Sequence, residues 1–282
     1  FFSPNTAFAN EEAFVYVPTG ATYEDLKPQL APLLKDLDAF ESVARRKRYL
    51  SNIRPGKFPV RKGMSNNEIV NSLRSRNTPV RISFNNQETP DLLAGRMASQ
   101  IEADSLELLQ SFMDADFLRE QGWSADQALL PYIPNSYEVY WNTSAEQFRD
   151  RMVREYENFW TENRREKARA QGLSPEQVMA LASIVHKETS QAKERPRVAG
   201  VYLNRLKRGM LLQADPTVIF AIKKKSGNFD TVIRRVLYRD LELDSPFNTY
   251  KYGGVPPGPI AMPDISAIEA VLNPEKHDFL YF

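Results

Sequence analysis

The segment from Ser174 to Thr189 constrains this chain most, because it predicts one amphipathic helix with a carboxyl group on its apolar side. Ser174 suits the N-cap, Pro175 suits the first helical position, and Gln177 completes a capping box. At about 100° per residue, Glu188 continues the side of the helix formed by the apolar residues Val178, Leu181, Ala182 and Val185.

A carboxyl group in this position has two interpretations. Burial disfavours the charged form, so it would raise the pKa of Glu188 and keep a proton available for general acid catalysis near neutral pH. The alternative is a half-exposed glutamate near a helix end that pairs with a lysine or an arginine, which is the commoner case. The helical pattern alone leaves both open.

Composition excludes several kinds of site. The 282 residues include no cysteine and only two histidines, so disulfides, thiol nucleophiles and a histidine-rich metal site are not expected. A net charge of +1, without a basic block that carries aromatic residues, gives no reason to expect a nucleic acid partner. No apolar run approaches the roughly 18 residues that cross a bilayer. The start at Phe1 without Met suggests a trimmed piece, so an upstream signal or anchor would not be seen.

The first 83 residues predict a small α+β module. Residues 13–17 alternate as a strand, and residues 22–34 have helical character interrupted by two prolines. Ser65 and Glu68 form a capping box that opens a short helix, and residues 80–84 alternate as another strand.

The rest of the chain predicts mostly helices, over residues 89–103, 105–113, 144–171, 194–208 and 266–272. Asp215 is expected to cap a further helix, with Pro216 at its first position. Residues 129–141 are aromatic and interrupted by proline, and we favour core packing over sugar stacking for them. Residues 245–263 predict an extended loop rich in proline and glycine, and residues 279–282 a strand.

Five separated stretches, in order and spacing, resemble the YceG-like family of bacterial lytic transglycosylases. They are residues 181–189 (LASIVHKET), 194–206 (ERPRVAGVYLNRL), 209–210 with 212–218 (GM and LQADPTV), 248–250 (NTY) and 256–260 (PPGPI). The sequences of these stretches are most similar to those of family members found in Bacteroidetes. The resemblance implies a mixed helical and β catalytic domain over residues 84–282. Residues 1–83 resemble a LysM-like module, a fold that holds glycan chains; a plain spacer or docking domain is the alternative.

The resemblance implies an endolytic enzyme that cleaves peptidoglycan glycan strands between N-acetylmuramic acid and N-acetylglucosamine and leaves 1,6-anhydromuramyl ends. It also implies an inner-membrane protein, held by one N-terminal helix that this sequence does not include, with its domains in the periplasm. Such enzymes work beside peptidoglycan synthases and terminate growing strands. One carboxyl group acts first as acid and then as base, so no metal or cofactor is expected.

The catalytic glutamate of the family corresponds to Glu188 in this chain. Five polar residues in the matching stretches are candidates for binding the sugars, namely Asn204, Gln213, Thr217, Asn248 and Tyr250. For Asn204 and Thr217, a capping or loop-holding hydrogen bond is an equal alternative. For Asp215, a capping role is the better explanation.

Two departures from the family pattern leave other functions open. Many members have a glutamate where this chain has His186, and members continue beyond the final stretch into a segment with a histidine and a helix. One alternative is therefore a catalytically impaired peptidoglycan-binding or scaffold protein. Another is a muramidase-type hydrolase, which activates water and needs a second carboxylate, for which Asp215 and Glu194 are the nearby candidates.

Overall fold

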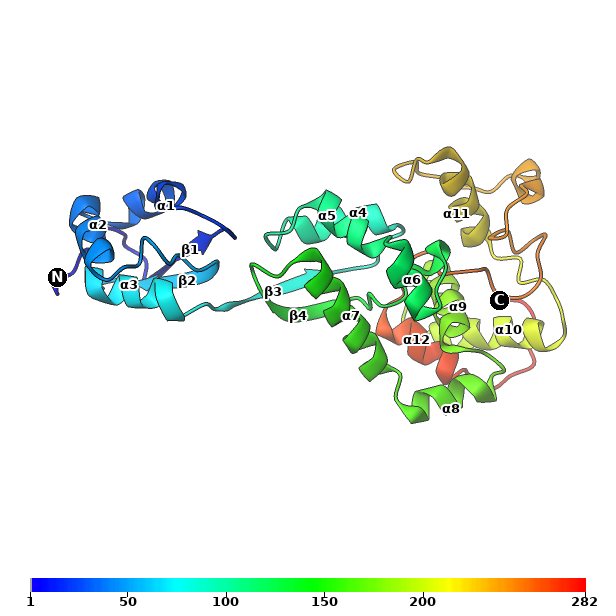
Figure 1. Ribbon diagram of the computed structural model, residues 1–282. Helices are drawn as coiled ribbons and strands as arrows, with labels where there is room; N and C mark the ends of the chain where they lie inside the picture. Colours follow the sequence, from blue (N-terminus) through cyan, green and yellow to red (C-terminus); the bar gives the residue numbers. More distant parts are fainter. Residues whose placement is uncertain (1) are drawn as a thin grey trace. The chain divides into compact units, whose positions relative to one another are not determined.

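The computed structural model describes residues 2–282 and divides them into two compact units (Figure 1). Unit 1 contains residues 1–82, 97–104 and 136–145, and unit 2 contains residues 83–96, 105–135 and 146–282. Helices occur in both units, and two small two-stranded sheets lie almost entirely in unit 1, which confirms the predicted α+β class.

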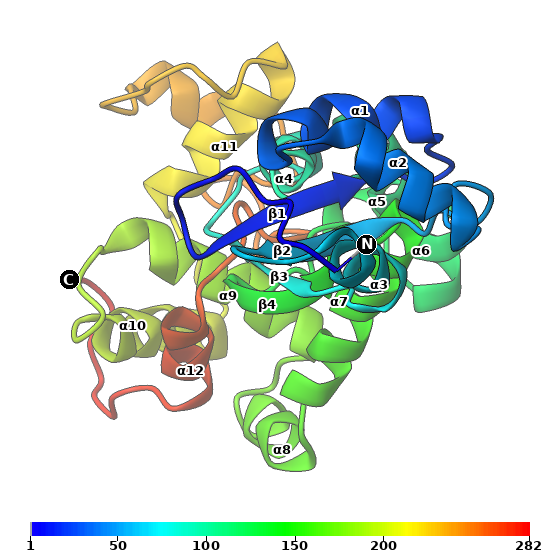
Figure 2. The ribbon, with the colours of Figure 1, turned by 90° about the vertical axis from the view of Figure 1, so that its left-hand side faces the viewer.

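Unit 1 begins with an antiparallel pair of strands that are connected through two helices and a short 3-10 turn. The order is β1 (Glu12–Val17), α1 (Tyr23–Leu30), η1 (Ala31–Leu33), α2 (Leu37–Arg46) and β2 (Gly56–Arg61). Helix α3 (Asn66–Ser75) follows, and it starts at the predicted capping box, since Ser65 accepts a hydrogen bond from the backbone N–H of Glu68. Figure 2 shows α1 and α2 on one side of β1 and β2, where their apolar side chains form a shared core.

A second sheet consists of β3 (Pro79–Phe84) and β4 (Asn135–Tyr140). Between them lie α4 (Pro90–Ala98), α5 (Ser105–Phe112), α6 (Ala115–Gln121) and η2 (Ala125–Gln127). Helix α6 was not predicted, although the sequence contains both of its caps: Asp114 accepts a hydrogen bond from the N–H of Phe117, and Gly122 has a left-handed conformation. Core packing was predicted for residues 129–141; residues 129–133 are buried, Tyr132 completely, whereas most of residues 134–141 are not, and Tyr140 is 53% exposed.

The predicted single helix over residues 144–171 is wrong. The structure has α7 (Ala145–Phe159) and α8 (Glu162–Ala170), and the chain turns at Trp160, whose ring is buried. Thr161 caps α8 by accepting a hydrogen bond from the N–H of Arg164. A threonine that bonds to the backbone in this way favours a helix start over a helix interior.

Unit 2 is built around α9 (Pro175–Glu188), whose residues 178–185 are all buried. It packs against α10 (Arg195–Lys207), α11 (Asp215–Ser226) and α12 (Ile265–Leu272), and Figure 1 shows α12 beside α9 and α10. The predicted caps of α9 are confirmed, because Ser174 accepts from the N–H of Gln177. Removing the buried side chain of Leu181 should cost about 2–5 kcal/mol of folding free energy.

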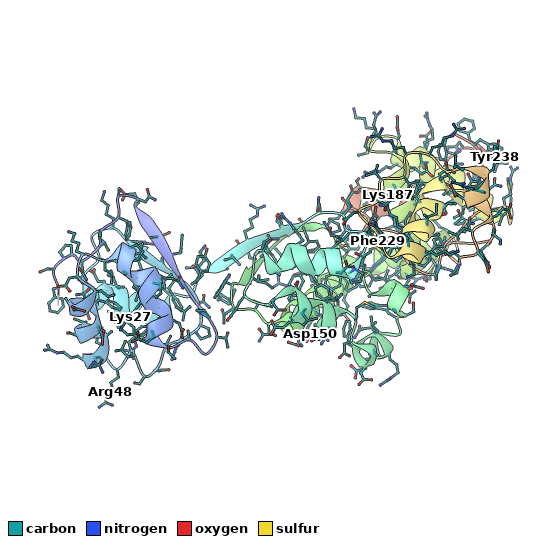
Figure 3. The ribbon with its side chains drawn as sticks, turned by 90° about the horizontal axis from the view of Figure 1, so that it is seen from above. Lys27, Arg48, Asp150, Lys187, Phe229 and Tyr238 are labelled. Atoms are coloured by element: carbon teal, nitrogen blue, oxygen red, sulfur yellow. The ribbon has the colours of Figure 1, made fainter. Side chains whose placement is uncertain are left out.

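The segment between α11 and α12 is a long loop that contains η3 (Tyr238–Glu242). Tyr238 lies at the outer edge of this loop (Figure 3) and is 91% exposed. The strand predicted for residues 279–282 does not form; these residues have no regular secondary structure. Side chains of α10 hold the segment instead, as Arg205 donates to the carbonyl of Leu280 at 2.6 Å.

Candidate active site

Glu188 is the last residue of α9, and Tyr202 of α10 faces it. The side chain of Glu188 is half-buried, and the hydroxyl of Tyr202 donates to its Oε1 at 2.7 Å. The ring of Tyr202 is buried in the core of unit 2 and contacts the ring of Phe282 edge-on, with centroids 5.7 Å apart. The helix therefore ends by presenting one carboxyl group whose orientation is fixed by a hydrogen bond.

The surroundings of Glu188 favour its protonated form. Burial raises the pKa of Glu188, the hydrogen bond from Tyr202 lowers it, and the negative charge of Asp215 raises it, so that the pKa lies above its usual value. The last carbonyl groups of α9 add partial negative charge at the same end. A carboxyl group with a raised pKa, open to solvent on one side, can donate a proton and later accept one.

Asp215 and Tyr250 form a second carboxylate–tyrosine pair near Glu188. The hydroxyl of Tyr250 donates to Oδ1 of Asp215 at 2.6 Å, and burial together with that carboxylate raises the pKa of Tyr250. Asp215 is exposed and is the first residue of α11, whereas Ala214 is the N-cap, so the capping role predicted for Asp215 is wrong. Its carboxylate is directed to Tyr250 instead.

Hydrogen bonds around Thr249 hold the segment that leads into α11 against the segment that contains Tyr250. The carbonyl of Thr249 accepts from the N–H of Gln213 at 3.1 Å, and its hydroxyl oxygen accepts from the N–H of Ala214 at 3.0 Å. The same hydroxyl lies 2.8 Å from that of Thr217. Residues 212–217 and 248–250, more than thirty positions apart in the sequence, are thereby fixed side by side.

The structure separates the predicted sugar-binding residues into two groups. Gln213 is exposed with a left-handed φ of 50°, and Tyr250 is half-exposed. Thr217 and Asn248 are completely buried. Asn248 donates to the carbonyls of Leu241 and Leu243, which gives it a loop-holding role.

Asn204 lies on a different face of α10 from Tyr202. Its amide donates to the carbonyls of His277 and Phe279 at 2.7 and 3.0 Å. Positions 202 and 204 are about 200° apart around a helix. Asn204 therefore anchors the chain after α12 and does not face Glu188.

His186 belongs to a polar cluster that fixes the end of α9. The guanidinium of Arg195, which is 4% exposed, donates to both carboxylate oxygens of Asp264 at 2.7 Å and also to Ser266. It also lies 3.3 Å from Nδ1 of His186 and contacts the carbonyl of Thr189. Burial lowers the pKa of His186, which leaves the imidazole neutral near pH 7. In this chain, position 186 thus supports the helix end that carries Glu188.

Lys187 joins a second cluster, on the other side of the same helix end. It donates to Oε1 of Glu88 at 2.5 Å, and Lys223 donates to Oε2 at 2.9 Å. Burial alone would raise the pKa of Glu88, but the two lysines outweigh it and lower the pKa. Figure 3 labels Lys187 within unit 2.

The proline-rich stretch of residues 256–260 is bound to α9 by a buried serine. Ser183 donates to the carbonyl of Ala180 and accepts from the N–H of Ile260 at 3.0 Å. Gly258 cannot be replaced without movement, because a Cβ there would lie 2.0 Å from the carbonyl oxygen of Asp126. Residues 256–260 are therefore packed in a fixed position between α9 and the chain near Asp126.

Comparison with known proteins agrees with these motifs. The sequence matches the YceG-like family over residues 15–282. The chain belongs to the YceG-like family. A Bacillus subtilis relative named "Endolytic murein transglycosylase" is 28% identical over 95% of this chain and 77% of its own length. A relative of the same name from Streptococcus pneumoniae is 27% identical over 97% of this chain, which spans about half of that protein (55%).

A solved structure supports the family assignment. The crystal structure of a YceG-like protein from Listeria monocytogenes aligns with a TM-score of 0.62 and 27% identity, and the match covers 97% of this chain and 94% of that one. The match therefore extends over both units of this chain. Within residues 2–282, no helix is long and apolar enough to cross a membrane.

Sequence reasoning missed two members of the site. Tyr202 was expected only to face inward from its helix, and Glu88 was not singled out. Tyr202 lies 14 residues after Glu188, on the next helix, and a polar hydroxyl on an apolar helix face was the available signal. Glu88 lies 99 positions before Lys187, and no local pattern relates them.

Proposed function

We propose that this YceG-like protein is an endolytic murein transglycosylase with Glu188 as its catalytic residue. The observation that carries the proposal is the half-buried Glu188, with a raised pKa and a hydrogen bond from Tyr202, at the position that the family resemblance gives to the catalytic glutamate. The names of the bacterial relatives supply the substrate class, the glycan strands of peptidoglycan.

In the first step, protonated Glu188 donates its proton to the glycosidic oxygen between N-acetylmuramic acid and N-acetylglucosamine. The C1–O bond breaks, and the hydroxyl of Tyr202 stabilises the new carboxylate through its bond to Oε1. In the second step, the carboxylate accepts the proton of the muramic acid C6 hydroxyl, whose oxygen bonds to C1 and closes the 1,6-anhydro ring. Glu188 ends protonated, ready for another turnover.

We assign Gln213 and Tyr250 to substrate contact beside Glu188. Both side chains are accessible to solvent where residues 212–217 meet residues 248–250. Thr217 and Asn248 are assigned to holding those segments, and Asn204 to holding the chain after α12. The Asp215 charge contributes by keeping the pKa of Glu188 high.

A muramidase-type hydrolase is the second candidate, and Asp215 is the observation that favours it. Hydrolysis by inversion needs a base that activates water, and Asp215 is the charged carboxylate that acts on Glu188. Its Oδ1 is engaged by Tyr250 at 2.6 Å, which argues for a supporting role. Glu194, the other candidate, accepts from the hydroxyl of Thr189 at 2.6 Å.

Product analysis tests these functions. Purified peptidoglycan is digested with this chain and with Glu188→Gln, and the products are read by mass spectrometry. Anhydromuropeptides from the parent chain alone support the proposal, and reducing ends support the hydrolase. Absence of cleavage with retained binding to peptidoglycan would instead indicate a scaffold protein.

The cellular setting is also part of the proposal. We infer a periplasmic enzyme, tethered to the inner membrane by an N-terminal anchor, that terminates strands beside peptidoglycan synthases. The α+β segment from β1 to β2, with two helices between paired antiparallel strands, supports a LysM-like glycan-holding role for residues 1–83. Fractionation of cells that express the full-length protein, and binding of the isolated segment to glycan strands, test these two points.

A further inference from the structure

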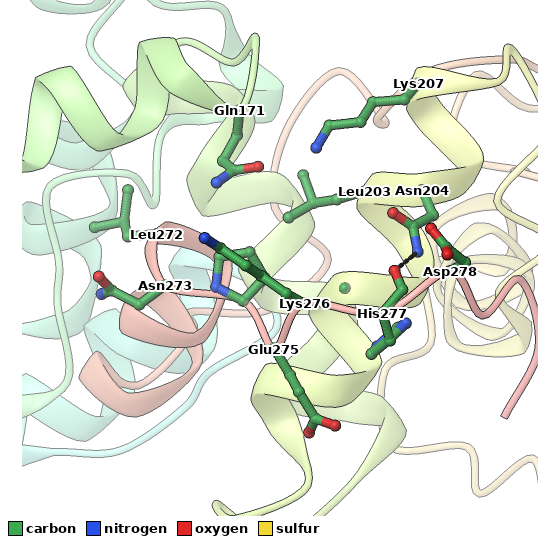
Figure 4. A pocket seen from close by; sticks show the side chains of 12 residues that line it. Gln171, Leu203, Asn204, Lys207, Leu272, Asn273, Glu275, Lys276, His277 and Asp278 are labelled. Carbon is green, nitrogen blue, oxygen red and sulfur yellow. Dashed lines mark hydrogen bonds between the residues drawn. The ribbon is translucent and has the colours of Figure 1, made fainter.

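A polar pocket of about 780 Å³ lies on the face of α10 that points away from Glu188 (Figure 4). Gly200, Leu203, Asn204 and Lys207 line it from α10, with spacings of three and four residues that put them on one helix face. Tyr202, which binds Glu188, is about 200° away from Gly200 around the same helix. The other walls come from Gln171 and from the chain that follows α12.

The floor of the pocket is rigid. Gly200 allows residues 275–277 to approach α10, since a Cβ at this glycine would lie 2.7 Å from both the carbonyl oxygen of Glu275 and Nε2 of His277. The N–H of Glu275 donates to the carbonyl of Pro196 at 3.0 Å, and Asn204 holds the carbonyl of His277. A ligand would meet a surface that is already formed, which lowers the entropic cost of binding.

The charge of the pocket favours an anion. Lys207 and Lys276 are exposed, and neither ammonium group forms an ion pair or hydrogen bond with another residue between 2 and 282. Glu275 pairs with Arg197 at 3.1 Å, so Asp278 is the carboxylate of the lining that remains outside an ion pair. Figure 4 shows the Gln171 amide and the Lys207 ammonium directed into the pocket, with Lys276 on the facing wall.

The lining is also unlike a sugar platform. Its residues include amides and lysines but no tryptophan, tyrosine or phenylalanine. Sugar faces stack on such aromatic rings, whereas carboxylates and peptide groups are bound by ammonium groups and amides. The pocket therefore fits a short acidic peptide better than a glycan.

We propose that this pocket binds the carboxylates of the peptide stems that peptidoglycan strands carry, while Glu188 acts on the glycan. The proposal rests on the proposed function. A helix with its side chains is about 10–12 Å wide, and an extended stem of four residues spans about 13–14 Å. The path round such a helix from one face to the opposite one is about 16–19 Å, so a stem attached to a muramic acid near Glu188 covers most of it. Lys207 and Lys276 would then select strands that still carry their stems.

The test measures the cleavage of two substrates by the parent chain and by the double variant Lys207→Gln/Lys276→Gln. Glycan strands with their stems, and the same strands after an amidase has removed them, are cleaved by the parent chain and by the variant. We expect kcat/KM to fall about tenfold on stem-bearing strands, since hydrogen bonds to charged groups are the stronger class. Stem-free strands should be cleaved at equal rates. Lys225→Gln, an exposed lysine of α11 outside the pocket, is the matched control and should change neither rate.

Binding of the free stem gives a readout that is independent of cleavage. Calorimetric titration with a stem tetrapeptide should show binding to the parent chain and to Glu188→Gln. Binding should be lost in the double variant and with a tetrapeptide whose carboxylates are amidated. Equal rate losses on both substrates, or binding that survives the double substitution, would overturn the proposal. If the parent chain cleaves neither substrate, the proposed function fails, and the titration still decides the pocket.

Discussion

Glu188 ends α9 and Glu88 pairs with the preceding residue Lys187, and the structure gives these two glutamates opposite properties. Burial raises the pKa of both Glu188 and Glu88. Glu88 meets two lysines, which lower its pKa and hold it as a carboxylate. Glu188 meets a neutral tyrosine and a nearby negative charge, so its pKa stays raised. The charges of the neighbouring side chains thus decide which buried carboxyl group forms stabilising ion pairs and which one has the raised pKa that general acid catalysis requires.

The largest effect should come from removing the acid itself. Glu188→Gln keeps the shape and the hydrogen bond from Tyr202 but cannot transfer a proton. We expect cleavage of peptidoglycan to fall by about 10³-fold or more. Glu88→Gln is the matched control at the other glutamate, and it should retain most of the activity. Comparable losses in the two variants, measured by release of soluble muropeptides, would remove the distinction between the two sites.

The second largest effect should come from removing the hydrogen bond that Tyr202 of α10 donates to Glu188. Tyr202→Phe removes the donor that stabilises the carboxylate form, so the pKa of Glu188 should rise further. Activity requires protonated Glu188, and the alkaline limb of the pH–rate profile should therefore move to higher pH. The maximal rate should fall by about tenfold, because the base step loses a charge-assisted hydrogen bond. An unchanged profile would show that Tyr202 only fills space.

Substitution of Glu88 and of Glu188 by glutamine should change the free energy of unfolding in opposite directions. Glu88 has a lowered pKa, so its contribution is present above its unfolded pKa and is lost as the pH falls through the folded value. Glu188 has a raised pKa, so its charged form costs stability at neutral pH. At pH 7, Glu88→Gln should lower the free energy of unfolding by about 1–2 kcal/mol.

Glu188→Gln should raise the same quantity by about 0.5–1 kcal/mol, as is common for catalytic residues. Urea unfolding at pH 7 and at pH 4 measures both changes, and the difference between the parent and Glu88→Gln should shrink at the lower pH. A destabilised Glu188→Gln chain would contradict the idea that burial of this carboxyl group lowers the stability of the fold.

The smallest effect concerns the negative charge near Glu188. Asp215→Asn removes that charge but keeps an oxygen that can accept from Tyr250. The pKa of Glu188 should fall, and the alkaline limb should move to lower pH, opposite to Tyr202→Phe. The rate near neutral pH should drop by about threefold. A loss as large as that of Glu188→Gln would point to hydrolysis with Asp215 as the base.

The fold was predictable where short-range rules act alone. The capping residues Ser65 and Ser174 start their helices as expected, and the apolar spacing of α9 correctly placed Val178, Leu181, Ala182 and Val185 on a buried side. The single helix over residues 144–171 was wrong because Thr161 competes for the backbone, a local signal that helical periodicity does not include. The terminal strand was wrong because a strand needs a partner, and residues 279–282 have α10 side chains instead.

The sequence by itself determined that Glu188 ends an amphipathic helix on its apolar side, because helix caps and apolar spacing are properties of neighbouring residues. Only the tertiary structure decided which protonation state that position favours. Tyr202 and Asp215, which set the pKa of Glu188 together with burial, come from other helices, 14 and 27 positions further along the chain. Electrostatic interactions depend on distances in space, and those distances exist only once the helices have packed.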